Sequence, residues 1–311
     1  MLKWGRTFCY AAMLICGLGL TLFALIGKAS AAEPTGVIVY QSDFGLKDGA
    51  VSAMRGVAYS VDPTLRLENL THEIPAFNIW EGAYRLNTTA PYWPPGTVFV
   101  SVVDPGVGTD RKSVVLMTTS GHYFVTPDNG TLTLVSESLG IEEVREIDEA
   151  TNRLEGSEQS YTFHGRDVYS YTAARLASGQ IRFEEVGGAL PLEVTSLDYQ
   201  QPDFTGDSLV GTIPVLDIQF GNVWTNIDRE TFEEMNVDKG ETLAVVILEN
   251  DQVMFEGKIP YVSTFGDVPE GDELAYLNSV NNLSFAINWG NFADTHGISS
   301  GAEWRVEVTR P

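Results

Sequence analysis

Apolar runs and amphipathic stretches alternate through the first third of the chain. Residues 36–40, 65–70 and 97–103 are apolar runs that predict strands, and the last has the continuous apolar character of a strand buried on both faces. Residues 48–59 and 78–90 predict the helices between them. The order β-α-β-α-β favours a largely parallel sheet with helices on both faces, as in a Rossmann-like α/β domain.

A hairpin and two more helices extend this pattern. Residues 113–119 and 122–126 predict the two strands of the hairpin. The turn sequence PDNG that follows begins a helix, and residues 168–177 predict another.

The pattern changes beyond residue 191. Residues 192–207 are polar and irregular, which predicts a linker after an N-terminal α/β domain at residues 36–191. Residues 208–311 then predict an antiparallel, barrel-like β domain. Its strands are expected at residues 208–216, 242–248, 253–259, 273–277, 283–287 and 304–309, with a short helix near 231–235.

The first 32 residues differ from the rest of the chain. Lys3 and Arg6 precede an apolar run at residues 7–27, and the sequence Ala-Ser-Ala at 29–31 offers a small-residue cleavage site. We therefore expect a signal peptide at residues 1–32 and an exported, periplasmic or extracellular protein. The apolar run is also long enough to serve as an uncleaved N-terminal membrane anchor.

Charge and cysteine content narrow the classes of partner and cofactor. The chain of 311 residues carries a formal net charge of −23, and without the leader it would keep 16 basic against 42 acidic residues. This acidity disfavours nucleic acid, and anionic membrane surfaces after signal cleavage, as partners. Cys9 and Cys16 both lie in the leader, so the mature chain would contain no disulfide, thiol nucleophile or cysteine metal site. The four histidines have no paired-ligand spacing, and we expect neither a metal nor a cofactor.

Asp104 directly follows the apolar strand at residues 97–103, at the start of a glycine-rich turn. In open α/β sheets ligands bind at the carboxyl ends of strands, where loops diverge from a rigid framework. Arg111 follows seven residues later, near enough across a tight turn to form a charge-assisted, bidentate pair with Asp104. The alternative is an aspartate that only caps the turn.

Two more places in this domain carry candidate chemistry. Asp43 lies just beyond the strand at residues 36–40, and Asp48 follows it. His164 precedes the helix at residues 168–177, where it could act as a general base or orient a water molecule. A histidine with a purely structural role is the competing interpretation.

In the β domain, the stretch DIQFGNVWTNI at residues 217–227 contains side chains suited to binding a ligand. It sets Phe220, Asn222 and Trp224 around a glycine, so that flat faces stand beside an amide that can donate and accept hydrogen bonds. Such a group suits a purine ring. A β-turn over an aromatic core is the alternative.

Seven motifs occur in the order found in a known family. They are SDFGLKDGAV, HEIP, VSVVDPGVGTDR, PDNG, TFHGRD, FGNVWTNI and YLNS. The chain thus resembles the S-adenosyl-L-methionine (SAM) hydroxide adenosyltransferases, adenosine-forming SAM hydrolases related to the SAM-dependent fluorinase and chlorinase. The resemblance implies an N-terminal α/β domain joined to a C-terminal β-barrel, SAM as substrate without a cofactor, and a homotrimer with active sites between subunits.

The resemblance also implies roles for individual residues. Asp104, Arg111 and His164 would activate the water that attacks the ribose 5′ carbon, expelling methionine and leaving adenosine. The substrate-binding residues would be Asp43 at the ribose hydroxyls with Asp48 close by, Phe77 near the sugar, Asp217 at the methionine amino group, Phe220 and Trp224 along the pocket, Asn222 at adenine, and Ser279 near the methionine carboxylate.

Three positions separate hydrolases from halogenases within this resemblance. The halogenases carry tyrosines in place of Asp104 and His164 and a serine in place of Gly165, so the pattern favours hydrolysis. Val280 and Ile287 stand where the halogenases carry arginines, which affects recognition of the methionine carboxylate and of adenine. A halogenase, and an exported nucleoside- or SAM-binding protein without turnover, are the alternative hypotheses.

Overall fold

A computed structural model describes residues 32–311. The signal peptide expected at residues 1–32 therefore lies outside the described residues, apart from its last position. Within the described part, none of the helices has the length and apolar character needed to cross a bilayer.

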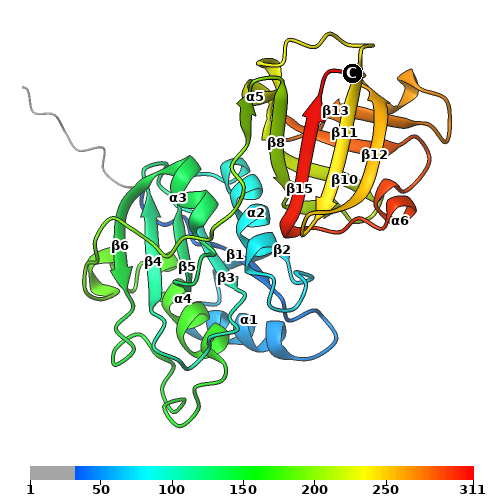
Figure 1. The fold of residues 1–311 in the computed structure, drawn as a ribbon. Helices are drawn as coiled ribbons and strands as arrows, with labels where there is room; N and C mark the ends of the chain where they lie inside the picture. The colour runs from blue at the N-terminus through cyan, green and yellow to red at the C-terminus, as the bar shows by residue number, and fades with distance from the viewer. Residues whose placement is uncertain (1–31) are drawn as a thin grey trace, which may run out of the picture. The chain divides into compact units, whose positions relative to one another are not determined.

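The N-terminal half contains one six-stranded sheet (Figure 1). Its strands are β1 (Val37–Ser42), β2 (Arg66–Thr71), β3 (Val98–Val102), β4 (Ser113–Thr118), β5 (Tyr123–Pro127) and β6 (Ile141–Glu146). They lie in the order β2-β1-β3-β5-β4-β6. β1, β2, β3 and β5 run parallel, whereas β4 is antiparallel to both β5 and β6. The largely parallel sheet expected from the sequence is thus present, with the hairpin strand β4 reversed.

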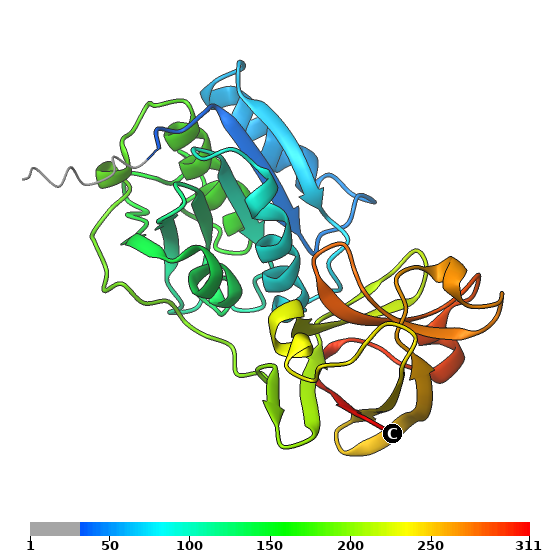
Figure 2. The ribbon, with the colours of Figure 1, turned by 90° about the horizontal axis from the view of Figure 1, so that it is seen from above.

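Helices cover both faces of this sheet (Figure 2). They are α1 (Ala50–Val61), α2 (Ile79–Thr89), α3 (Thr133–Leu139) and α4 (Tyr171–Ala177), with 3₁₀ turns at Ala90–Tyr92 and Phe183–Glu185. Side chains alternate along each strand, so Ile38 packs in one cluster with Met54 of α1, and Val39 in another with Leu86 of α2. This arrangement confirms the expected α/β architecture.

The C-terminal half contains two antiparallel sheets. Its elements are β7 (Asp203–Thr205), β8 (Ser208–Ile213), β9 (Val215–Asp217), β10 (Asn222–Asp228), α5 (Arg229–Glu233), β11 (Thr242–Glu249), β12 (Gln252–Pro260), a 3₁₀ turn (Phe265–Asp267), β13 (Glu273–Leu277), β14 (Asn282–Ile287), α6 (Phe292–His296) and β15 (Gly301–Thr309). One sheet has the order β13-β14-β10-β9 and the other β12-β11-β15-β8-β7. Their inner faces share one apolar cluster that includes Val223, Phe285 and Trp304.

The barrel expected for this half is not closed among residues 32–311. The stretch 208–216, expected as one strand, breaks at Pro214, with β8 in one sheet and β9 in the other. Proline has no N–H to donate to a strand ladder, which explains the break. β12 and β13 are joined only by the isolated bridge between Tyr261 and Ala275. The correct description is a mixed α/β fold whose C-terminal part has two open antiparallel sheets.

Four elements were not predicted from the sequence. β6 is an edge strand with a single buried residue, Val144, so it lacks an apolar run. β7 falls within the range assigned to the linker, and α6 is only one turn long. β10 overlaps the stretch at residues 217–227 that the sequence pattern marked for binding chemistry, and it was not among the expected strands.

Candidate active site

The turn after β3 brings Arg111 back to Asp104. The amide of Val107 donates to the Asp104 carbonyl at 3.3 Å, which tightens the turn. Arg111 Nε then donates to Asp104 Oδ1 at 2.9 Å and Nη2 donates to Oδ2 at 2.5 Å. The two side chains are only 11% and 5% exposed. The bidentate pair expected from the sequence is formed, and its burial strengthens both bonds.

His164 is the third member of this group. Arg111 Nη2 donates a further hydrogen bond to His164 Nδ1 at 3.0 Å. Because a guanidinium only donates, Nδ1 must accept, and in the neutral ring the proton is on Nε2. That Nε2 is buried and has no hydrogen-bond partner among residues 32–311. An unpaired buried N–H is costly, so this atom is a donor suited to a water or substrate oxygen.

Electrostatics favour the neutral form of this ring. Burial lowers the pKa of His164, Glu149 opposes this shift, and the guanidiniums of Arg111 and Arg153 reinforce it. The lowered pKa leaves the His164 ring uncharged near neutral pH, with Nε2–H as its donor.

An unusual helical turn fixes where His164 lies. His164 is the N-cap of a π-helix, Gly165–Ser170, which continues directly into α4. Single π-turns within helices occur frequently at functional sites. A Cβ on Gly165 would stand 3.2 Å from a Val102 side-chain carbon and 3.3 Å from Phe44, so the chain packs tightly here.

Three residues of this cluster were missed by the sequence analysis. Ser113 Oγ accepts from Arg111 Nη1 at 3.0 Å and lies 3.2 Å from the hydroxyl of Tyr169. Glu149 Oε1 lies 4.0 Å from His164 Nδ1. None of them belongs to a motif with a chemical signature, although the four-residue spacing of Glu149 and Arg153 is that of a helical ion pair.

The Asp43 loop lies beside this cluster. Asp43 Oδ2 accepts from the amide of Phe77 at 3.0 Å, and Phe77 has the unusual φ of +69°. Phe77 is 71% exposed. The ring of Phe44 packs edge-on against Phe163, next to His164, with centroids 5.7 Å apart. Asp48 is further along the loop, where its carboxylate accepts from the amide of Ala50, the first residue of α1.

The histidine of the HEIP motif, His72, holds this loop by hydrogen bonds. Ser42 Oγ lies 2.7 Å from His72 Nδ1, and His72 Nε2 lies 3.0 Å from Asn69 Oδ1. The amide of Gly45 also donates to the His72 carbonyl at 2.7 Å. Ser42 and His72 are almost fully buried, so they position the loop that carries Asp43.

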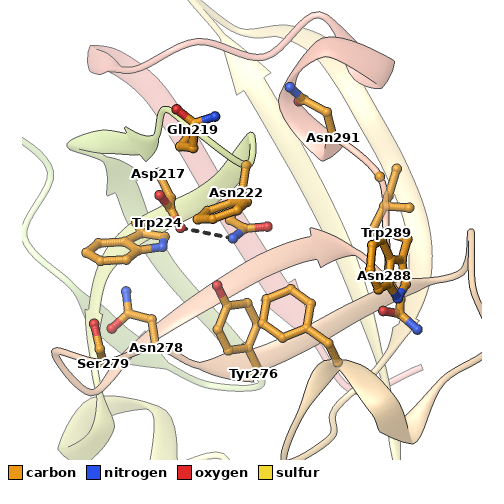
Figure 3. A pocket seen from close by; sticks show the side chains of 14 residues that line it. Asp217, Gln219, Asn222, Trp224, Tyr276, Asn278, Ser279, Asn288, Trp289 and Asn291 are labelled. Atoms are coloured by element: carbon orange, nitrogen blue, oxygen red, sulfur yellow. Dashed lines mark hydrogen bonds between the residues drawn. The ribbon is translucent and has the colours of Figure 1, made fainter.

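The remaining predicted site residues meet in a second place. A pocket of about 810 Å³ is lined by residues of the four-stranded sheet and of the loops next to its strands (Figure 3). Asn222 Nδ2 donates to Asp217 Oδ2 at 3.1 Å, which orients both side chains. Ile287 lines the pocket as well. The predicted residues found here are Asp217, Phe220, Asn222, Trp224 and Ser279, joined by Gln219, Phe265, Tyr276, Asn278, Asn288, Trp289, Gly290 and Asn291.

The two groups of candidate residues are separate within one chain. Among residues 32–311, no hydrogen bond or ion pair joins Asp104, Arg111 or His164 to a residue that lines the pocket. The same part of the chain contains no cluster of three histidine, cysteine or acidic side chains arranged to hold a metal ion.

Comparison with known proteins relates both groups to one family. Family models for the SAM hydroxide adenosyltransferase N-terminal and C-terminal domains match residues 38–187 and 211–305. A Methanocaldococcus jannaschii protein named (R)-S-adenosyl-L-methionine hydrolase is 38% identical over 277 residues, which cover 88% of this chain and 92% of the relative. A fluorinase from Nocardia brasiliensis is 30% identical, with 88% and 97% covered. The crystal structure of an uncharacterized conserved protein from Thermotoga maritima matches with a TM-score of 0.81 and 34% identity, over 88% of this chain and 100% of that one. The chain belongs to the SAM hydroxide adenosyltransferase family.

Proposed function

We propose that this protein hydrolyses SAM to adenosine and L-methionine by attack of water on the ribose 5′ carbon. The observation that carries the proposal is the buried series Asp104–Arg111–His164, which ends in an unpaired Nε2–H donor at the carboxyl edge of the parallel strands. Relatives named (R)-S-adenosyl-L-methionine hydrolase, at 38% and 33% identity, support SAM as the substrate.

The reaction is an in-line displacement. The oxygen of water bonds to C5′ while the C5′–S bond breaks, and the sulfur keeps the electron pair, so methionine leaves as a neutral thioether. One hydrogen of the water stays as the 5′-hydroxyl and the other leaves as a proton to solvent. Since the sulfonium is already a good leaving group, the site mainly has to hold water and carbon in line.

Each residue of the series has a part in that positioning. His164 Nε2–H donates to the oxygen of the attacking water, which leaves a lone pair directed at C5′. Arg111 holds His164 in this tautomer by donating to Nδ1. Asp104 fixes the guanidinium by its two hydrogen bonds and balances its charge, so no unpaired cation faces the cationic substrate.

The pocket in the C-terminal half would take the rest of the substrate. Its volume of about 810 Å³ lies in the range usual for small-molecule sites. Asn222 would hydrogen-bond adenine between the faces of Phe220 and Trp224, while Asp217 and Ser279 would bind the methionine amino and carboxylate groups. Asp43, with Asp48 and Phe77 near it, would take the ribose hydroxyls. The relatives' names specify the (R) form, so both sulfonium epimers of SAM should be assayed.

The packing around Gly165 argues against the halogenase alternative. A serine there would press its Cβ against Val102 and Phe44 at 3.2–3.3 Å, closer than ordinary van der Waals contact. The neighbouring side chains would have to move to admit it. Product analysis in saturating chloride tests this directly, because a halogenase would yield a 5′-chloro nucleoside.

We also propose a homotrimer with active sites between subunits. In each site the N-terminal α/β domain of one chain would contact the C-terminal β domain of another, and the linker at residues 192–207 joins the two domains within each chain. The separation of the two residue groups within one chain supports this, as do large apolar side chains at the site. Phe77, Phe220 and Trp289 are 71%, 63% and 88% exposed. Co-expressed Asp104→Ala and Asn222→Ala chains should regain activity in mixed trimers, and the mass in solution should be that of three chains.

For localisation, we propose that a signal peptide at residues 1–32 directs export of the protein to the periplasm or the exterior. It rests on the sequence pattern alone. Mass spectrometry of the N-terminus of the protein recovered from cells distinguishes a cleaved leader from a retained membrane anchor.

The deciding experiment is incubation of the chain from Ala32 onward with SAM, followed by chromatography of adenosine and methionine. We expect equimolar release of both products, lost in Asp104→Ala and His164→Ala while adenosine binding persists. Adenosine binding without product release would favour the exported binding protein, and parental turnover in the His164 variant would refute the role of the series.

A further inference from the structure

A second carboxylate faces the imidazole of His164. Glu149 lies in the segment between β6 and His164, and its Oε1 is 4.0 Å from His164 Nδ1. Its other oxygen, Oε2, accepts from Arg153 Nη1 at 2.6 Å. The mechanism described above does not use Glu149, yet its carboxylate is held beside the nitrogen that accepts from Arg111.

The surroundings hold Glu149 firmly in this place. The Arg153 side chain is 5% exposed, and its Nη2 donates to the Ser160 carbonyl at 2.6 Å. Its guanidinium also stacks on Tyr161, with 4.6 Å between the carbon and the ring centroid. The backbone of Tyr161 in turn packs on Gly108, where a Cβ would come within 2.9 Å of the Tyr161 carbonyl. The segment is therefore anchored to the same turn that brings Arg111 to Asp104.

Glu149 can provide a hydrogen bond that Arg111 cannot. In the neutral ring, Nδ1 accepts from Arg111. In the protonated ring Nδ1 carries a hydrogen, which would point at a guanidinium that has only hydrogens to offer. Besides Arg111, the charged or titratable groups around His164 are Asp104, Glu149 and Arg153, with the rings of Tyr161 and Tyr169 against its faces. Asp104 is already occupied by both bonds from Arg111.

We propose that Glu149 is a positioning residue of the hydrolytic site. When the His164 ring gains its second proton, the Glu149 carboxylate accepts the hydrogen bond from Nδ1–H. The inference rests on the proposed function only in linking this event to turnover. Protonation then moves His164 from Arg111 to Glu149 and turns the Nε2–H away from the attacking water. Glu149 thus sets the acid limit of activity, and Arg153, which neutralises Glu149, moves that limit in the opposite direction.

The test compares Glu149→Gln with Glu155→Gln, the same change at an exposed position in the same segment. A carboxylate 4.0 Å away stabilises the imidazolium, so its loss should shift the acid limb of kcat to lower pH by roughly 0.7 pH unit or more. Arg153→Gln should shift the limb to higher pH, and Glu155→Gln should leave it in place. A limb that stays in place in Glu149→Gln, or that moves the same way in both site variants, would overturn the proposal.

A second readout does not depend on turnover. Nitrogen-detected NMR of histidine-labelled protein, with the His164 signals assigned by His164→Asn, reports both the tautomer and the titration of the ring. We expect the Nε2–H tautomer near neutral pH and a titration midpoint that falls in Glu149→Gln. Equal midpoints in parent and variant, or a His164 that never gains a proton while the protein stays folded, would refute the role of Glu149. A protein that titrates as expected but does not cleave SAM would refute the proposed function alone.

Discussion

Arg111→Lys is the most informative single change in the hydrolytic site. The guanidinium makes four hydrogen bonds at once: two to Asp104, one to His164 and one to Ser113. Lysine keeps the positive charge but replaces the planar fork with a single ammonium. The substitution therefore separates the contribution of charge from that of geometry.

The magnitude follows from the bonds that an ammonium cannot reproduce. From one position it can replace the contact to one Asp104 oxygen but cannot also reach His164 and Ser113. Three of the four bonds are then lost, and losing three bonds to charged or buried groups costs about 3 kcal/mol or more. If that loss falls on the orientation of His164 in the transition state, kcat should fall about 100-fold or more.

The assay is the rate of adenosine release against SAM concentration, with adenosine affinity measured separately by calorimetry. We expect kcat to fall while adenosine affinity stays near the parental value, because Arg111 is not among the residues that line the pocket proposed for adenosine. Arg145→Lys is the matched control, since Arg145 pairs with Glu143 at 2.5 Å and donates to the Gly187 carbonyl at 2.8 Å, away from the site. It should lower stability without changing kcat. A kcat within threefold of the parent in Arg111→Lys would refute the claim that the fork orients His164.

Two further predictions concern the nucleoside pocket and the loop that carries Asp43. Asn222→Ala should weaken adenosine binding by about 1–3 kcal/mol, since the adenine edge and Asp217 both lose a partner; calorimetric affinity equal to the parent's would assign adenine recognition to other residues. Burial, with Arg55 contributing, lowers the pKa of His72 from 6.5 to about 4, so the unfolded chain binds a proton that the folded chain does not between those values. The free energy of unfolding should therefore fall by up to about 3 kcal/mol as the pH drops through that window. In urea titrations His72→Asn should be less stable at pH 7 but show a flatter pH dependence, and an unchanged slope would contradict this account.

The N-terminal sheet was predictable because its signals are local. Residues 97–103 form a mostly apolar run that is buried throughout, and α2 begins after the capping residue Asn78. β6 was missed because an edge strand with one buried residue has no such run. The two open sheets of the C-terminal half could not be predicted for another reason. Which strand pairs with which depends on long-range contacts, and Pro214 marks just one of the places where the chain changes sheet.

The site was predictable where short spacing determines contact. Asp104 and Arg111 are joined by one tight turn, so their pairing follows from the sequence between them. His164 contacts Arg111 across 53 residues of sequence, and Glu149 lies in an irregular segment, so neither contact can be inferred from local pattern. The tautomer of His164 likewise depends on the direction from which Arg111 approaches.

The π-helix at Gly165–Ser170 makes the position of His164 depend on chain length as well as on residue type. Deletion of one residue from this turn would restore α-helical hydrogen bonding. The residues before the turn, including His164, would then shift by one helical position, about 100° around the helix axis and about 1.5 Å along it. His164 Nδ1 would then lose its hydrogen bond from Arg111, although Asp104, Arg111 and His164 would all still be present. In an alignment of family members, a one-residue gap at this turn should therefore mark the loss of the site in sequences that keep all three residues.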